Sequence, residues 1–138
     1  MNPKITSITL SVNDLEKSVS FYRDGLGLPT DGIVPTSDEP DDEGRIALFM
    51  LEGGLILSLY PKKNLAKDTN LALTSSSSLE FTLMHQVESK AEVDLIMNKA
   101  QAAGATIANT AHDRGGGVYS GFFQDIDGHL WEIVSSSE

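Results

Sequence analysis

Asp125-Ile126-Asp127-Gly128-His129-Leu130-Trp131-Glu132-Ile133-Val134 is the stretch that decides the fold. An Asp-Gly pair between two strand-forming runs is a strong hairpin signal, because glycine tolerates positive φ and aspartate bonds its own backbone in a turn. We therefore expect the chain to double back at Asp127-Gly128. Alternation along the strand that follows puts Leu130, Glu132 and Val134 on one face and Trp131 and Ile133 on the other. Glu132 is thus an acid set between apolar neighbours.

The residues before this hairpin predict a helix and the strands that flank it. Ser89 followed by Glu92 matches a capping box, and Gly104 is a good helix end. The apolar residues between them recur at i, i+3, i+4 and i+7, namely Val93, Ile96, Met97 and Ala100. The glycine-rich segment Asp113–Gly117 predicts a mobile loop. Strands are expected over residues 79–87, 105–108 and 118–124.

The first half of the chain repeats this order of elements. Ile5–Val12 predicts a strand whose apolar face holds Ile8, Leu10 and Val12. Asn13 with Glu16 resembles a capping box, so a helix should run from there to about Gly25. A second hairpin is then expected around Glu52-Gly53-Gly54, between two apolar runs at residues 46–51 and 55–60. Pro61 should stop the pairing.

The two halves therefore look like an internal duplication. An offset of about 75 residues aligns Val12 with Val87 and Ser7 with Thr82. A similar offset aligns Gly54 with Gly128 and Ser58 with Glu132. This pattern predicts an α+β fold in which two βαβββ modules stand in tandem within one domain. The modules span about 4–61 and 79–135, and the polar, aperiodic residues 62–78 link them.

Composition limits the function classes. A chain of 138 residues with 40% hydrophobic content suits one compact domain, and we expect it in the cytoplasm because it has no signal peptide or membrane-length apolar run. The absence of cysteine excludes disulfides, thiolate ligands and a cysteine nucleophile. The net charge of -10 opposes nucleic-acid binding and favours cationic ligands. Solubility alone is the plainer interpretation of that charge, as it is of the acidic loop Asp38–Glu43.

Motifs at the two ends of the chain resemble one known family. The front reads Val12-Asn13-Asp14-Leu15-x-x-Ser18-Val19-x-Phe21-Tyr22, and the end reads Asp125-x-Asp127-Gly128-His129-x-Trp131-Glu132. With the βαβββ duplication, these motifs resemble the vicinal oxygen chelate superfamily, which includes glyoxalase I, bleomycin-resistance proteins, fosfomycin-resistance enzymes and extradiol dioxygenases. Within it the chain is similar to a bacterial branch labelled glyoxalase-like. The resemblance implies a curled, cup-like mixed sheet around a cavity, and a homodimer.

The resemblance also locates the metal ligands of metal-dependent members. The four equivalent positions here are Ser7, Ser58, Thr82 and Glu132. Divalent ions prefer imidazole or carboxylate ligands, so only Glu132 keeps a ligand-capable group. We expect no metal and no other cofactor, although a divalent metal stays open if His85 joins Glu132. Strand alternation, however, points His85 away from the face of Thr82.

The resemblance suggests further residues for the site. Glu132 is either a catalytic base or ligand partner, or a strand acid with a local partner. Trp131 faces the other way and is expected in the core. Three residues of the glycine-rich segment could close over a ligand as a lid, namely His112, Asp113 and Arg114. The residues expected to line the cavity are Ser7, Phe49, Ser58, Thr82 and Tyr119.

Three functions fit this sequence. The first is a small-molecule-binding protein that acts as a lyase or isomerase, similar to lactoylglutathione lyase, with Glu132 as the base. The second is a non-catalytic drug-binding protein of the bleomycin-resistance type, which would hold a cationic compound in an acidic crevice. The third is a regulatory module without a pocket. All three expect no nucleic acid or membrane partner, and a small organic ligand is expected for the first two.

Overall fold

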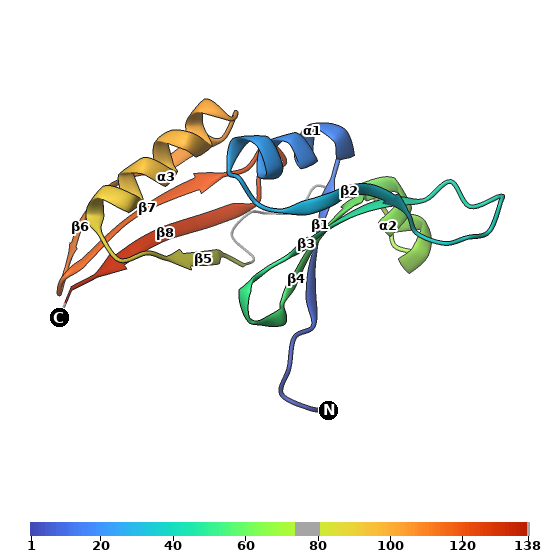
Figure 1. Cartoon of the computed structure of the whole chain (residues 1–138), viewed down its shortest axis with the longest axis horizontal. Helices are drawn as coiled ribbons and strands as arrows, with labels where there is room; N and C mark the ends of the chain where they lie inside the picture. Colours follow the sequence, from blue (N-terminus) through green and yellow to red (C-terminus); the bar gives the residue numbers. More distant parts are fainter. Residues whose placement is uncertain (74–80, 138) are drawn as a thin grey trace. The chain divides into compact units, whose positions relative to one another are not determined.

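The computed structural model describes residues 1–73 and 81–137. The chain divides into two compact units, Met1–Thr74 and Ser75–Glu138. Within the described residues each unit holds a four-stranded mixed sheet, ordered β1-β4-β3-β2 in the first and β5-β8-β7-β6 in the second (Figure 1). The expected α+β fold built from tandem modules is therefore confirmed. No helix in these residues is long and apolar enough to span a membrane.

The first unit follows the predicted order closely. Its β1 pairs in parallel with β4, and β4, β3 and β2 pair antiparallel. The strand begins at Ser7 instead of Ile5, whose side chain is 67% exposed. The elements are β1 (Ser7–Val12), α1 (Leu15–Ser20), the π-helical turn η1 (Phe21–Gly25), β2 (Thr30–Pro35), β3 (Arg45–Met50), the 3₁₀ turn η2 (Glu52–Gly54), β4 (Ile56–Pro61) and α2 (Lys62–Thr69).

The cap of α1 corrects one prediction. Asp14, and not Asn13, is the N-cap, and its Oδ1 accepts a hydrogen bond from the backbone N–H of Lys17 at 3.1 Å. Asp and Asn are almost equally good N-caps, so two candidates side by side leave the first residue of a helix undecided by type alone. The helical segment still ends at Gly25, as expected, with the last turn in π-helical geometry.

The helix α2 corrects a second prediction. Residues 62–69 were expected to belong to an irregular linker, yet they form a helix that directly follows Pro61. Pro61 is the last residue of β4 and lies opposite Val12 in the last pair of the parallel ladder, so the pairing ends at Pro61 as predicted. Asn70, in the left-handed conformation at φ 62°, ends the helix. Residues 74–78 of the expected linker lie outside the described residues.

A hydrogen bond ties α2 to the sheet. The hydroxyl of Tyr60 donates to Oδ2 of Asp68 at 2.6 Å, and Tyr60 is only 9% exposed. This bond to a carboxylate, together with burial, raises the pKa of Tyr60 to about 12. The bond explains why a short polar segment without an apolar stripe is helical, since tertiary contacts add to its weak intrinsic propensity.

Titration of Tyr60 tests this contact. Because folding raises its pKa from about 10, the folded state keeps the phenolic proton longer, and this stabilisation is present below pH 10 and lost as the pH rises through about 12. We expect an ultraviolet titration to include a late ionisation from Tyr60, and Asp68→Asn to move this ionisation to lower pH. Asp31→Asn, an exposed control, should leave it unchanged. An unaltered titration in Asp68→Asn would show that the hydrogen bond between Tyr60 and Asp68 does not hold α2 to the sheet.

The second unit contains the other half of the duplication. Its β5 pairs in parallel with β8, and β8, β7 and β6 pair antiparallel. Ser89 caps the helix as predicted, because its Oγ accepts from the backbone N–H of Glu92 at 3.1 Å. The elements are β5 (Leu83–Gln86), α3 (Lys90–Ala102), β6 (Thr106–Gly115), β7 (Val118–Gln124) and β8 (Leu130–Ser136). The helix α3 packs against β6, β7 and β8.

The closing hairpin forms where the sequence predicts it. Gly128 has φ 91°, so it takes the conformation for which glycine was expected. Asp125 holds the turn. Its buried carboxylate accepts hydrogen bonds from the backbone N–H groups of Asp127 at 2.9 Å and His129 at 2.8 Å. This turn sets the register that fixes where Glu132 points.

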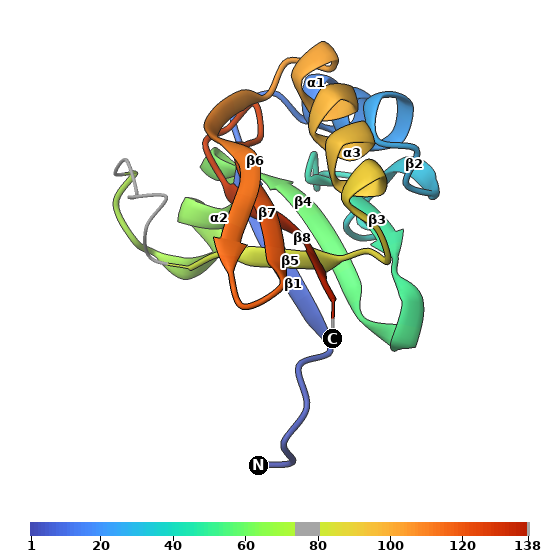
Figure 2. The same ribbon diagram turned by 90° about the vertical axis from the view of Figure 1, so that its left-hand side faces the viewer.

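The expected glycine-rich loop is absent. Residues 113–115 belong to β6, and β6 and β7 form a hairpin that closes at Gly116 and Gly117, both with positive φ (Figure 2). Two adjacent residues with positive φ suit the tight turns that join antiparallel strands. The prediction of a mobile loop at Asp113–Gly117 was therefore wrong, since consecutive glycines here close a turn. The short strand expected over 105–108 is the start of this longer strand.

Candidate functional site

In the second unit, Glu132 points away from α3. It lies opposite Phe122 of β7 and Met84 of β5, so these three side chains share the face of the sheet that α3 does not cover. We call this surface the open face of the second sheet. Glu132 is half-buried there. Among the described residues its carboxylate has no hydrogen-bond or ion-pair partner.

A cation is fixed on the same open face. Nε of Arg114 donates to Oγ of Ser120 at 3.0 Å, and its Nη2 donates to the carbonyl oxygen of Ser120 at 2.9 Å. Its guanidinium carbon lies 5.4 Å from the centre of the Phe122 ring, a cation–π distance. Neighbouring strands β6, β7 and β8 therefore present a guanidinium, an aromatic ring and a carboxylate on one surface.

His112 completes the support of Arg114. Its Nε2 lies 3.0 Å from Nη1 of Arg114, and its Nδ1 lies 2.9 Å from the carbonyl oxygen of Thr110. A guanidinium only donates, so Nε2 accepts and Nδ1 carries the proton that it donates to the carbonyl. The sequence named His112 and Arg114 as lid residues, whereas the structure places both on a paired strand where Arg114 is held at two atoms of Ser120.

Asp113, the remaining lid candidate, takes part in a different contact. Its Oδ1 lies 2.8 Å from Nζ of Lys90, the first residue of α3, and that Nζ lies 5.4 Å from the centre of the Tyr119 ring. Both members of the ion pair are more than half exposed. The pair therefore joins β6 to α3 at the surface and contributes little stability.

Tyr119 was expected to line the ligand cavity, and the structure places it away from the open face. It lies on the face that α3 covers, where its hydroxyl donates to Oδ1 of Asp94 at 2.6 Å. This bond to a carboxylate raises the pKa of Tyr119. Trp131 lies on the same covered face and stacks on the fully buried Phe123, with ring centres 6.2 Å apart and planes within 5°. The predicted core position of Trp131 is supported by this stack, although its own side chain is half-buried.

Phe49 was also expected in the cavity and lies instead in the core of the first unit. It pairs with Leu57, so it shares the face of β4 that packs against α1 and is 0% exposed. Its ring centre is 6.0 Å from that of Tyr22. Strand alternation puts Phe49 on the opposite face from Ser58.

The other residues of the predicted site in the first unit share one face. Ser7 pairs with Ile56, so Ser7 lies on the same face of the sheet as Ser58 and Tyr60. Ser58 is 4% exposed, while Ser7 at the strand start is exposed. This face offers hydroxyl groups and no charged group at the positions that correspond to metal ligands.

In the second unit, His85 does not extend the open face. Thr82 is exposed and precedes β5, which starts at Leu83. His85 lies opposite Ile133, so it points to the face away from Glu132, as alternation predicts. The described residues contain no group of three His, Asp or Glu side chains that could hold a metal ion. The donors at the four family positions, three hydroxyls and one carboxylate, do not fit a catalytic metal.

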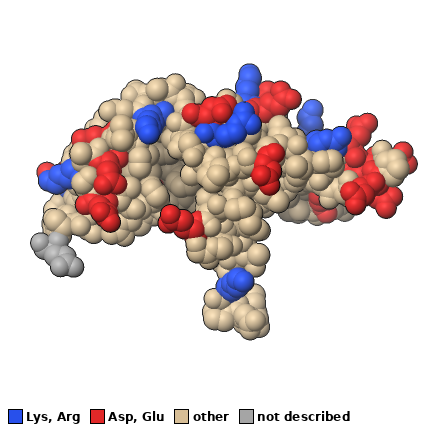
Figure 3. Space-filling model, in the orientation of Figure 1, with Lys and Arg blue, Asp and Glu red and all other residues tan. Residues whose placement is uncertain are grey.

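The acidic loop between β2 and β3 is a separate feature at the surface. Figure 3 shows Asp and Glu side chains gathered at the far end of this connection, where the sequence has Asp38–Glu43. Asp42 accepts hydrogen bonds from Oγ of Ser37 at 2.7 Å and from the backbone N–H of Gly44 at 2.8 Å, which lower its pKa. These bonds serve the fold of the loop, so Asp42 has a structural role in it.

Comparison with known proteins places this fold in a family. The family model described as Glyoxalase/Bleomycin resistance protein/Dioxygenase superfamily matches residues 4–133. The chain belongs to this superfamily. That membership agrees with the resemblance carried by the motifs at the two ends of the sequence.

Individual known proteins resemble the chain over nearly its full length. An uncharacterised Bacillus subtilis protein, YraH, is 31% identical over 134 residues, which cover 94% of this chain and 96% of YraH. Metallothiol transferase FosB of Staphylococcus epidermidis is 28% identical over 96% of this chain and 84% of its own length. The crystal structure of a glyoxalase-related enzyme from Fulvimarina pelagi has a TM-score of 0.78 at 30% identity, covering 97% of this chain and 88% of that chain.

Sequence reasoning missed the row formed by Arg114, Phe122 and Glu132. The signal that could have found it is Gly116-Gly117 between two runs able to form strands, which is a tight hairpin pattern. Extending that hairpin by alternation would have put Ser120 and Phe122 on the face of Glu132. The three breaks in the β6 register would still have hidden the position of Arg114.

Proposed function

We propose that this superfamily member binds a small organic molecule on the open face of the second sheet, without a tightly bound catalytic metal. The observation that carries the proposal is the half-buried Glu132 carboxylate, which has no partner among the described residues. A half-buried carboxylate that has no protein partner is open to pairing with a ligand. A ligand that donates a hydrogen bond or carries a positive charge can form that pair.

The neighbours of Glu132 define the kind of ligand. Phe122 offers a ring face and Met84 a flexible apolar side chain, which suit the hydrocarbon part of a ligand. Arg114 is fixed through Ser120 and His112, so its position does not depend on the ligand. We infer a polar organic compound with a donor or cationic group toward Glu132 and an apolar body over Phe122.

Binding without chemistry is one version of this function, and catalysis is the other. As an enzyme, the protein would be a lyase or isomerase in which Glu132 removes a proton from the bound substrate as a general base. As a drug-binding protein, it would use the same carboxylate to hold a cationic compound. The donor set at Ser7, Ser58, Thr82 and Glu132 supports metal-free binding in either case.

The test uses thermal unfolding with three probes, namely bleomycin, fosfomycin and S-lactoylglutathione, each in the presence of a chelator. We expect the cationic bleomycin to raise the melting temperature, because ligand bound to the folded state stabilises it. Glu132→Gln should abolish the increase, and Glu88→Gln, which removes an exposed acid of the same unit, should preserve it. Adding Mn²⁺, Ni²⁺ or Zn²⁺ should not enlarge it.

Three results bear on the competing versions. Conversion of S-lactoylglutathione that is lost in Glu132→Gln would support the lyase version of the same site. A probe effect that needs added metal, or sub-micromolar metal binding lost in Glu132→Ala, would overturn the metal-free proposal. If the probes raise the melting temperature equally in Glu132→Gln and Glu88→Gln, Glu132 does not take part in ligand binding. Light scattering on the same samples tests the expected homodimer.

A further inference from the structure

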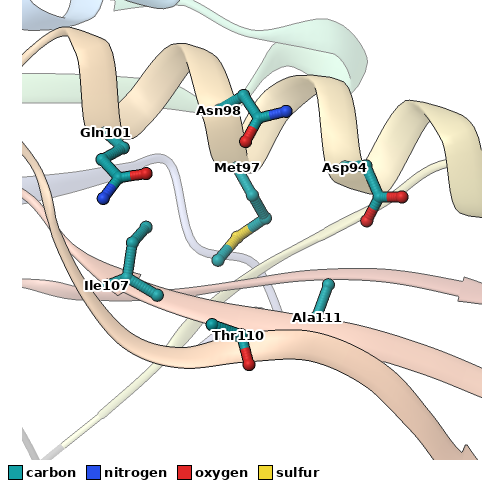
Figure 4. A pocket seen from close by; sticks show the side chains of 7 residues that line it. All are labelled: Asp94, Met97, Asn98, Gln101, Ile107, Thr110 and Ala111. Carbon is teal, nitrogen blue, oxygen red and sulfur yellow. The ribbon is translucent and has the colours of Figure 1, made fainter.

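The second unit contains a groove on the covered side of its sheet, between α3 and β6. Its volume is about 290 Å³, close to the lower end of the range for small-molecule pockets. Its floor is apolar and is formed by Met97, Ile107 and Ala111 (Figure 4). Because Glu132 points to the other side of the same sheet, this groove is distinct from the site proposed above.

Irregular pairing of β6 explains why the groove exists. The register between β6 and β7 breaks between Ile107 and Asn109, and again between Asn109 and His112. In a regular strand Thr110 and Ala111 would point to opposite faces, yet both line the groove. Bulges re-aim side chains in this way and are common beside binding sites. The small side chain of Ala111 leaves the space open.

The rim of the groove is polar and carries one negative charge. Three side chains follow each other along α3 at i, i+4 and i+7, namely Asp94, Asn98 and Gln101. They line the groove from α3, and Thr110 lines it from β6 (Figure 4). Among the residues that the structure describes, no Lys, Arg or His lines the groove. The nearby Lys90 forms an ion pair with Asp113.

The hydrogen bonds of the rim leave acceptors for a ligand. Oδ1 of Asp94 accepts from the hydroxyl of Tyr119 at 2.6 Å, which fixes the carboxylate at the groove. Within the described residues Oδ2 has no partner, and the side-chain amides of Asn98 and Gln101 have none. The sulfur of Met97 adds a soft acceptor at the floor. One fixed carboxylate, several neutral acceptors and an apolar floor suit a small ammonium compound.

We propose that the groove between α3 and β6 is a second binding site, which takes a small organic amine. Its ammonium group pairs with Asp94 and its short apolar body lies on Met97, Ile107 and Ala111. The probe is 2-phenylethylamine, with 2-phenylethanol as a neutral compound of the same size and 3-phenylpropionate as an anion. Binding is followed by backbone amide shifts in the whole chain, which locate each probe by residue.

We expect the amine to shift the amides of residues 94–101 and 107–111 in a saturable way, and the alcohol and the acid to bind far more weakly. Asp94→Asn keeps an acceptor for Tyr119 but removes the charge. It should weaken amine binding at least about tenfold, the scale of a lost hydrogen bond to a charged group. Ala111→Leu should fill the groove and abolish the shifts. Glu88→Gln and Glu132→Gln should leave them unchanged.

The proposal has clear ways to fail. Equal binding of the amine and the alcohol would show that the positive charge of the amine does not contribute to binding. Unchanged amine binding in Asp94→Asn would show the same. Shifts confined to residues 130–134 and lost in Glu132→Gln would place the amine on the open face and leave the groove without a ligand. If Ala111→Leu does not fold, Asp94→Asn alone decides the outcome.

Discussion

Replacing Phe49 by alanine should lower the free energy of unfolding by about 3–5 kcal/mol, the usual cost of removing a buried phenylalanine. The side chain is 0% exposed and lies edge-on to Tyr22 under α1. Its loss leaves a cavity that the rigid sheet and helix cannot close. Urea unfolding followed by circular dichroism measures the effect.

Leu48→Ala is the matched control for this prediction. Leu48 is the preceding residue of β3, points to the opposite face and is 37% exposed, so its truncation should cost much less. If Phe49→Ala were as stable as Leu48→Ala but lost ligand binding, Phe49 would line a ligand cavity as the sequence first indicated, and its place in the core would be wrong.

Replacing Gly121 by alanine should destabilise the protein by about 1–3 kcal/mol, the usual cost of overpacking. A Cβ at this position would lie 2.8 Å from Cε of Met97 and 3.0 Å from the backbone nitrogen of Ala111. The methionine can move, whereas relief of the second contact requires β6 to shift. Thermal and urea unfolding of Gly121→Ala measure the cost.

A double variant separates the two contacts of Gly121. Met97→Ala should remove the contact with Cε, so Gly121→Ala should cost less in that background than in wild type. The remaining cost reports the contact with the β6 backbone. Equal costs in both backgrounds would show that Met97 does not fill the space above Gly121, which would also change the floor of the groove.

The position of Glu132 was predictable, whereas those of Phe49 and Tyr119 were not. The Asp-Gly turn fixes the register of the last strand, so alternation assigns Glu132 to a face correctly. Residues 46–51 and 118–124 carry apolar side chains on both faces. Alternation therefore does not indicate which face of the sheet is buried, and only the packing of α1 and α3 decides which face is core.

The misassigned glycine segment has a different physical cause. Consecutive glycines are compatible both with an irregular loop and with a turn that needs positive φ at adjacent positions. Pairing of β6 with β7 selects the turn, and this pairing depends on side chains far from Gly116 and Gly117. The helix α2 was missed for a similar reason, because its support from Tyr60 is a tertiary contact that local periodicity does not contain.

The uneven pairing of β6 also affects how the protein behaves at high concentration. This strand is an edge of its sheet, and a long regular edge offers unpaired backbone groups on which another chain can add a strand. Three breaks in register within ten residues twist that edge and spoil the spacing that an incoming strand needs. At the other edge β5 is only four residues long. The second sheet is therefore protected at both edges against aggregation by strand addition.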